Sequence, residues 1–238
     1  ILIDVGAHHG SVSRRFARKG WQVIAFEPEP ENRSAFTKNL AGLPEVTCLP
    51  LAVSDRGGEK VPFYVSDEHF GIHSLRPFHK THTRMLEVHT VRLDQVLDLL
   101  GIEKVSLLKI DIEGADYPAL LGFDVSRFRP ELVMLEFMDE RTQKNFGYSH
   151  HDVVAHMYKL GYAALVSEWA PIIEYAREGF PGEPHTWLQC APYPLEHGPA
   201  WGNLIFVPRK RFTDLAGALQ DYVGWLIERI NRETTQNA

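Results

Sequence analysis

The sequence has few cysteines, no long apolar run and no excess of basic residues. Its 238 residues include only two cysteines, Cys48 and Cys190, which excludes a disulfide framework and a zinc site built on cysteines. This usage suits a reducing compartment, so we expect a cytoplasmic protein. No apolar run approaches the roughly 18–20 residues that a membrane-spanning helix needs. With 25 basic and 31 acidic residues, the formal net charge of −6 argues against a nucleic-acid-binding protein.

The composition is that of a folded globular chain. Hydrophobic residues make up 44% and charged residues 24%, which argues against disorder. The length suits a single domain over residues 1–238. The sequence opens at Ile1 without an initiator methionine, so we expect the native N-terminus to lie upstream.

The first thirty residues read as strand, glycine turn, helix and strand, which is the start of a parallel βαβ unit. The same alternation continues along the chain. Strands are predicted at Ile1–Val5, Trp21–Phe26, Val46–Val53, Ser106–Ile110, Glu131–Phe137, Tyr162–Val166 and Asn203–Val207. Helices are predicted at Val12–Lys19, Pro30–Leu40, Leu93–Leu100 and His150–Leu160. The pattern predicts an α/β fold with a doubly wound, mostly parallel, seven-stranded sheet.

Two segments interrupt the alternation. A β-rich insert over 55–92 is expected to hold strands at Val61–Val65 and Glu87–Arg92. The insert carries five histidines without a recognisable zinc spacing: His69, His73, His79, His82 and His89. The second segment, Glu168–Ala200, is rich in proline and aromatic residues, and we expect a lid-like loop on the acceptor side of the site, with Trp187 at its middle.

The C-terminal segment 212–232 is predicted to be an amphipathic helix. Its apolar face would consist of Leu215, Leu219, Tyr222, Val223, Leu226 and Ile230. We expect this face to pack on the sheet. A homodimer contact is the alternative.

The turn after the first strand is a candidate ligand site. Asp4, Gly6 and Gly10 form the pattern D-x-G-x-x-x-G between a strand and a helix, with Ala7 inside the turn. Glycines there let the backbone approach a ligand closely. The spacing does not match the G-x-G-x-x-G dinucleotide fingerprint, and the acidic Asp4 would repel a phosphate.

Glu27 follows the second strand, in Phe26-Glu27-Pro28, where a carboxylate can accept hydrogen bonds from both hydroxyls of a ribose. A carboxylate that can bind the ribose, without residues that bind a phosphate, indicates S-adenosylmethionine rather than NAD. Ala52 and Val53, at the end of the third strand, are expected beside the adenine ring.

An acidic motif ends the fourth strand. If the strand stayed extended, alternation would place Lys109, Asp111 and Glu113 on one side of it. Charges are costly inside a sheet unless they are paired or face a cleft. The strand therefore predicts a charged group of side chains in the ligand crevice.

These motifs together resemble the FkbM-type methyltransferase family. The resemblance rests on Ile3-Asp4-Val5-Gly6-Ala7-x-x-Gly10, Phe26-Glu27-Pro28, Val91-Arg92-Leu93-Asp94, Leu108-Lys109-Ile110-Asp111-Ile112-Glu113-Gly114 and Gly202-Asn203-Leu204-Ile205-Phe206-Val207-Pro208. It implies that Asp4, Gly6, Gly10, Glu27 and Asp111 lie at the cofactor. It implies a class I, Rossmann-like, S-adenosylmethionine-dependent O-methyltransferase that acts on a hydroxyl of a sugar, glycolipid or polyketide-type acceptor. His8-His9 in the turn, Asp116 and the Glu168–Ala200 segment depart from the family pattern and leave the acceptor open.

Methyl transfer to an alcohol needs an oriented oxygen and a group that takes its proton. Asp111 is the first candidate for either task and Glu136, at the end of the fifth strand, is the second. Lys109 could pair with either carboxylate or polarise the acceptor, and His73 is the candidate base from the insert. Asp111 and Glu136 could instead hold Mg²⁺, which the spacing permits but does not favour.

Two other classes of function stay open at this point. A catalytically inactive module would bind the cofactor without turning over. A dinucleotide-dependent oxidoreductase would bind NADH instead of S-adenosylmethionine.

Overall fold

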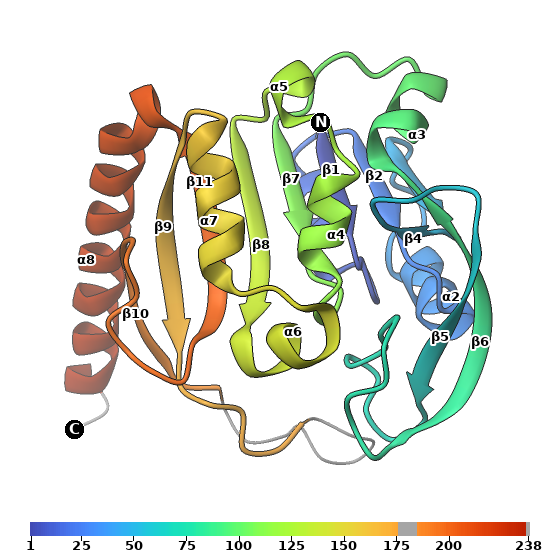
Figure 1. Ribbon diagram of the computed structural model, residues 1–238. Coiled ribbons are helices and arrows are strands. Elements are labelled where there is room, and N and C mark those ends of the chain that lie inside the picture. Colours follow the sequence, from blue (N-terminus) through green and yellow to red (C-terminus); the bar gives the residue numbers. More distant parts are fainter. Residues whose placement is uncertain (176–184, 237–238) are drawn as a thin grey trace.

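The computed structural model describes residues 1–175 and 185–236, and its larger sheet has eight strands (Figure 1). Their bounds are Leu2–Val5 (β1), Val23–Phe26 (β2), Val46–Leu49 (β3), Leu107–Ile110 (β7), Leu132–Met138 (β8), Tyr162–Trp169 (β9), Trp187–Pro192 (β10) and Trp201–Pro208 (β11). The strand order is β10-β9-β11-β8-β7-β1-β2-β3. The predicted doubly wound α/β sheet is confirmed, but the predicted number of seven strands is wrong.

The sheet is parallel from β3 to β8 and antiparallel beyond. β1 pairs in parallel with both β2 and β7, so the chain order reverses at β1. β11 is antiparallel to β8 and β9, and β10 is antiparallel to β9. In an open α/β sheet, ligands bind outside the carboxyl ends of the strands at such a reversal. The topology therefore places the site beyond the ends of β1, β2 and β7.

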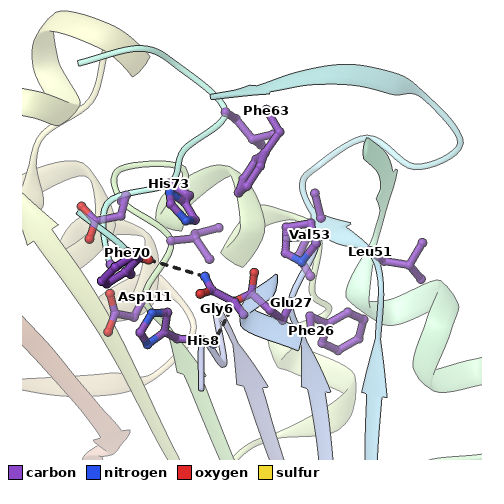
Figure 2. A pocket seen from close by; sticks show the side chains of 17 residues that line it. Gly6, His8, Phe26, Glu27, Leu51, Val53, Phe63, Phe70, His73 and Asp111 are labelled. Carbon is purple, nitrogen blue, oxygen red and sulfur yellow. Dashed lines mark hydrogen bonds between the residues drawn. The ribbon is translucent and has the colours of Figure 1, made fainter. Parts of the chain in front are cut away.

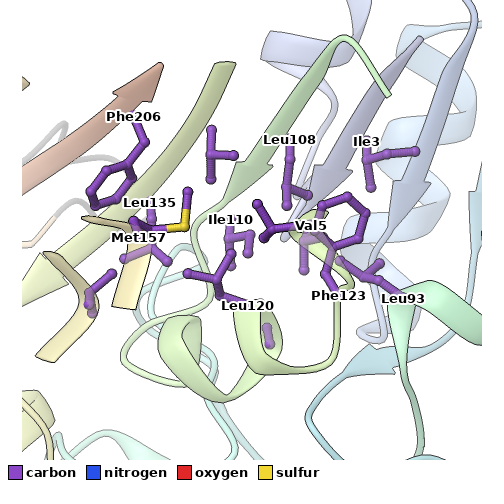
Figure 3. Close-up of a cluster of buried hydrophobic side chains, with 14 of the residues drawn as sticks. Ile3, Val5, Leu93, Leu108, Ile110, Leu120, Phe123, Leu135, Met157 and Phe206 are labelled. Carbon is purple, nitrogen blue, oxygen red and sulfur yellow. The ribbon is translucent and has the colours of Figure 1, made fainter. Parts of the chain in front are cut away.

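Helices cover both faces of this sheet. Their bounds are Ser11–Ala17 (α1), Pro30–Asn39 (α2), Leu93–Leu99 (α3), Asp116–Leu121 (α4), Val125–Phe128 (α5), Asp139–Phe146 (α6), His150–Lys159 (α7) and Phe212–Gln236 (α8). One apolar cluster joins α3, α4, α5 and α7 to the strands (Figure 3). A second, smaller cluster joins α1 and α2 to the opposite face.

The alternation of side chains along β1 produces this division. Ile3 and Val5 lie in the larger cluster, whereas Leu2 lies in the smaller one. All three are almost fully buried, and burying such a side chain contributes about 1.5–3 kcal/mol. The sheet is therefore held from both faces while its strand ends stay open to ligands.

The β-rich insert forms a second, three-stranded sheet. Its strands are Ala52–Val53 (β4), Lys60–Ser66 (β5) and His82–Val91 (β6), in the order β4-β6-β5. The two predicted insert strands are confirmed. The single predicted strand Val46–Val53 is wrong, because the chain leaves the large sheet at Pro50, which has no N–H for the ladder. The chain then pairs with β6 as β4.

The predicted loop Glu168–Ala200 contains regular structure. β9 extends to Trp169, and β10 adds the eighth strand at the sheet edge. The buried carboxylate of Glu168 accepts hydrogen bonds from Gln189 Nε2 (3.3 Å), the Glu196 backbone N–H (2.7 Å) and the His197 ring. This anchoring holds the described ends of the segment. Residues 176–184 of the predicted lid lie outside the described residues.

The C-terminal helix packs against β9 and β11, as predicted. Leu215, Leu219 and Val223 are half-buried there, but Tyr222 is 56% exposed and does not belong to the packed face. The side chains of Leu226 and Ile230 lie outside the described ones. Among the described residues, no helix combines the length and apolarity that a membrane crossing requires.

Candidate active site

Two adjoining cavities lie beyond the carboxyl ends of the central strands, and Figure 2 shows the smaller one. The smaller cavity has a volume of about 540 Å³ and the larger about 1530 Å³. The residues that line both are Gly6, His8, Gly71, Asp111 and Glu113. A group bound in one cavity can therefore meet a group bound in the other at this shared boundary.

The two glycines of the turn after β1 have different roles. Gly6 has φ 76° and lines both cavities, and a Cβ there would lie 2.0 Å from the backbone oxygen of Asp111. Gly10 has φ 78°, but a Cβ there would strike the side chain of Leu40 at 2.3 Å. Gly10 lines neither cavity, so the structure gives it a packing role at α2 in place of the predicted cofactor contact. Ala7 lines the larger cavity.

Asp4 and Lys109 form a buried ion pair beneath the shared boundary. Lys109 Nζ lies 3.3 Å from Asp4 Oδ1 and 3.4 Å from Asp111 Oδ2, and it donates to the Gly6 carbonyl at 3.0 Å. Asp4 is fully buried and also accepts a hydrogen bond from Ser13 Oγ at 2.6 Å. Asp4 therefore supports the site through Lys109 and lines neither cavity.

Lys109 stays charged in this arrangement. Burial by itself would lower the pKa of Lys109, but the Asp111 and Asp4 carboxylates raise it above its usual value. Three partners occupy the ammonium group. Of the two carboxylates predicted as partners, Lys109 thus pairs with Asp111. Its ammonium group is already protonated and cannot take a proton.

Glu27 lies where the prediction places it, facing the smaller cavity (Figure 2). Its Oε2 accepts the His8 backbone N–H at 2.8 Å and its Oε1 accepts that of Glu29 at 2.9 Å. Each oxygen keeps a second lone pair for a ligand. Burial raises the pKa of Glu27 to about 7. Pro28, Ala52 and Val53 line the same cavity.

Three carboxylates meet at the larger cavity, although not in the predicted way. β7 ends at Ile110, and Glu113 has φ 60°, so the side-chain alternation expected up to Glu113 is wrong. This left-handed turn still brings Glu113 beside Asp111 and Glu136, whose ligand oxygens all lie within 4.8 Å of one another. Asp111 is the most exposed of the three, with 42% of its side chain accessible.

Buried Asp116 shapes the turn that carries Glu113. Its carboxylate accepts the backbone N–H groups of Ile112 at 3.2 Å and Gly114 at 2.9 Å. Burial raises its pKa well above the usual value. Asp116 therefore has a structural task behind the site.

Arg141 is a site residue that the sequence prediction missed. It comes from α6, contacts Glu113 directly and lies 3.7 Å from Glu136 Oε2. Its guanidinium also donates to Tyr175 Oη at 3.0 Å and lies 4.1 Å from the centre of the Phe78 ring. The only signal in the sequence is an arginine five residues after Glu136, in a segment not predicted as helix. Arg141 supplies positive charge to the carboxylate cluster.

The two histidines of the smaller cavity are both neutral near pH 7. His73 lines that cavity and not the larger one, and burial lowers its pKa to about 4. Its Nδ1 accepts the Ser66 backbone N–H at 3.2 Å, so the ring proton sits on Nε2 and His73 can donate to a ligand. His8, which was not predicted, lines both cavities, and burial lowers its pKa to about 4. This geometry favours His73 as a donor beside the cofactor over a base for the acceptor.

The predicted role of Trp187 at the acceptor is wrong. Trp187 lies on the edge strand β10, is 43% exposed and lines neither cavity. The aromatic side chains of the larger cavity are instead Trp169, Tyr175 and Trp201. Trp169 and Tyr175 of the predicted segment thus line the cavity, together with Trp201 of β11, the strand that follows the segment.

Comparison with known proteins gives consistent matches. Residues 4–164 match the family described as the methyltransferase FkbM domain. The chain is 24% identical to 2-O-methyltransferase NoeI of Sinorhizobium fredii over 156 residues, covering 59% of this chain and 64% of that protein. It is 28% identical to Methyltransferase 1 of Beauveria bassiana over 144 residues, covering 52% and 58% of the two chains.

Among solved structures, a methyltransferase FkbM from Methylobacillus flagellatus KT aligns with a TM-score of 0.49 and 15% identity. That alignment covers 87% of this chain and 42% of the other. The chain spans about three fifths of the length of the two curated relatives, at 64% and 58%.

Proposed function

Because this chain belongs to the FkbM methyltransferase family, we propose that it transfers the methyl group of S-adenosylmethionine to a hydroxyl oxygen of a small-molecule or glycan acceptor. The observation that carries the proposal is the pair of cavities that meet at Asp111. One cavity suits a nucleoside and the other is polar, with aromatic walls. A methyl group held at their boundary would face an acceptor in the larger cavity.

The smaller cavity suits adenosine and does not suit a pyrophosphate. Glu27 would accept the ribose hydroxyls, and Leu51, Val53 and Phe63 offer apolar surface to an adenine ring. No lysine or arginine lines this cavity among the described residues. These features favour S-adenosylmethionine over a dinucleotide.

In the proposed reaction, Asp111 orients the acceptor hydroxyl towards the sulfonium methyl group. The reaction is an in-line displacement, so the protein's main tasks are to align the two reactants and to accommodate the hydroxyl proton. Asp111 is paired with Lys109 on one side and open to both cavities on the other. Its carboxylate can thus accept the hydrogen bond of the acceptor hydroxyl and receive its proton.

Calorimetry with S-adenosylhomocysteine, S-adenosylmethionine and NADH tests the cofactor assignment. We expect both adenosyl compounds to bind and NADH not to bind. Tight NADH binding without S-adenosylmethionine binding would support an oxidoreductase. Cofactor binding without turnover on any hydroxylated acceptor would support an inactive binding module.

The affinity for S-adenosylhomocysteine should rise with pH. Burial raises the pKa of Glu27 to about 7, and only its ionised form accepts two hydroxyl hydrogen bonds, so binding strengthens as pH rises through 7. Between pH 6 and pH 8 the expected gain is about tenfold, measured by calorimetry. Glu113 also lines this cavity and has a pKa raised to about 7 by burial, so a variant must separate the two groups.

Glu27→Gln provides that separation, because it removes the titrating group and leaves Glu113 in place. The affinity of this variant should be weaker and nearly constant over the same pH range. A native-like slope in Glu27→Gln would assign the titration to another group and contradict the ribose contact.

Metal removal should leave the enzyme active. The cluster of Asp111, Glu113 and Glu136 could hold Mg²⁺, but the guanidinium of Arg141 already lies against Glu113 and close to Glu136. After dialysis against a chelator, we expect methyl transfer to stay within about twofold of the untreated rate. A loss that added Mg²⁺ restores would instead assign the cluster to metal binding.

A further inference from the structure

We propose that Glu136 and Trp201 form a subsite for a second hydroxyl of the acceptor, so that the enzyme selects a vicinal diol. This inference rests on the proposed function, in which Asp111 holds the hydroxyl that receives the methyl group. The acceptor class would then be an uncharged molecule with two neighbouring hydroxyls. One would lie at Asp111 and the other between Glu136 and Trp201.

The sheet brings these two side chains together. β8 and β11 are antiparallel, with Asn203 opposite Glu136 and Trp201 opposite Met138. Side chains at alternate positions share one face, so Trp201 and Asn203 point to the same side as Glu136 and Met138. Glu136 and Trp201 both line the larger cavity.

The indole N–H of Trp201 needs a partner that the described protein does not supply. Only 8% of Trp201 is exposed, and its buried Nε1 has no hydrogen-bond partner among the described residues. Burial raises the pKa of Glu136 well above its usual value, and the interaction with the indole of Trp201 opposes this effect. Leaving a buried donor unpaired costs about 1–3 kcal/mol. A hydroxyl between them would accept from Trp201 and donate to Glu136.

Other unpaired atoms lie around the same cavity. Six buried side-chain polar atoms lack a hydrogen-bond partner in the described part of the chain, and three of them belong to residues that line this cavity. They are His8 Nε2, Arg141 Nε and Trp201 Nε1. These three unpaired polar atoms make the cavity suitable for a polar ligand with several oxygen atoms.

The spacing of the carboxylates limits how far apart the two hydroxyls can be. The ligand oxygens of Asp111 and Glu136 lie within 4.8 Å of each other. Glu113 contacts Arg141 directly, whereas Asp111 lies 3.4 Å from Lys109 and Glu136 lies 3.7 Å from Arg141, so these two carboxylates keep more capacity to bind hydroxyls. Two hydroxyls on neighbouring carbons of one molecule are close enough together to reach both carboxylates.

The charges of the subsite favour an uncharged acceptor. Lys109 lies between Asp4 and Asp111, and Arg141 lies against Glu113 and Glu136, so four carboxylates share these two cations. No net positive charge is left to attract a phosphate or carboxylate on the acceptor. A neutral polyhydroxylated ring, packed against Trp169 and Trp201, satisfies both the charges and the aromatic walls.

The test compares two small probes, trans-1,2-cyclohexanediol and cyclohexanol, in the presence of saturating S-adenosylhomocysteine. Ligand-observed NMR titration of the native chain should show the diol binding at least tenfold more tightly than the alcohol. Trp201→Phe keeps an aromatic ring and removes the N–H, so the preference should fall to within twofold. Glu136→Leu, which removes the other partner of the hydroxyl, should give the same loss.

Trp187→Phe is the matched control. It makes the same chemical change at an indole whose N–H donates to Ser167 Oγ at 3.2 Å, outside the cavities. This variant should keep the native preference. Equal affinities of the native chain for the two probes, including no binding of either, would overturn the subsite, as would a native preference in folded Trp201→Phe. A native chain that binds neither S-adenosylmethionine nor S-adenosylhomocysteine would overturn the proposed function and the subsite with it.

Discussion

Replacing Asp111 by asparagine is expected to lower kcat by about 10²- to 10⁴-fold, the usual cost of losing a positioned acid–base group. Asparagine keeps the size and one acceptor oxygen but removes the charge that would receive the hydroxyl proton. The fold should survive, because Lys109 retains Asp4 at 3.3 Å and the Gly6 carbonyl at 3.0 Å. Single-turnover transfer from labelled S-adenosylmethionine to an acceptor of the native enzyme measures the effect.

Calorimetry separates this effect from damage to the cofactor site. The affinity of Asp111→Asn for S-adenosylhomocysteine should stay within about threefold of native, since its carboxylate acts on the acceptor. Asp98→Asn makes the same change in a surface ion pair with Arg127, and its turnover should be native. Near-native turnover of Asp111→Asn would contradict the assignment of Asp111 as the group that receives the hydroxyl proton. Glu136 or a histidine would then be the candidate for that role.

Replacing Glu27 by alanine is expected to weaken S-adenosylhomocysteine binding by about 10- to 150-fold. Hydrogen bonds to a charged group contribute about 1.5–3 kcal/mol, and the ribose would lose its carboxylate partner. The variant also leaves the backbone N–H groups of His8 and Glu29 without their acceptor, so its melting temperature must be measured beside its affinity.

Glu29→Ala is the control for that local loosening. Glu29 is buried, accepts the Asn32 backbone N–H at 2.7 Å as the cap of α2, and lines neither the smaller nor the larger cavity. Its loss should cost about 1 kcal/mol of stability and leave cofactor affinity within a few-fold. If Glu27→Ala and Glu29→Ala weakened binding equally, the ribose contact would be refuted.

The parts of the fold that depend on local sequence were predictable. β1, β2, β7 and β8 are short runs of β-branched and aliphatic residues bounded by turns, and each lies within about two residues of its predicted bounds. Glu27 and Asp111 line the same cavity, because residues that follow parallel strands gather at one edge of the sheet.

The parts that depend on tertiary contacts were not predictable. Arg141 reaches the cluster because α6 turns back over the end of β8, and no local pattern fixes that direction. β10 forms because β9 offers an open edge, against the proline-rich composition of its surroundings. The role of Gly10 also depends on a distant contact, since it is the side chain of Leu40 that leaves no room for a Cβ.

The strand order also governs how the chain can fold during its synthesis. The central strand β1 is made first, but one of its partners is β7, with Leu2 paired to Leu107. At translation rates of about 5–20 residues per second, roughly 5–20 s separate the two strands. During that interval one edge of an apolar strand is open to pairing with other nascent chains. Yield in a recombinant host should therefore depend on chaperones that protect this edge until residue 110 has left the ribosome.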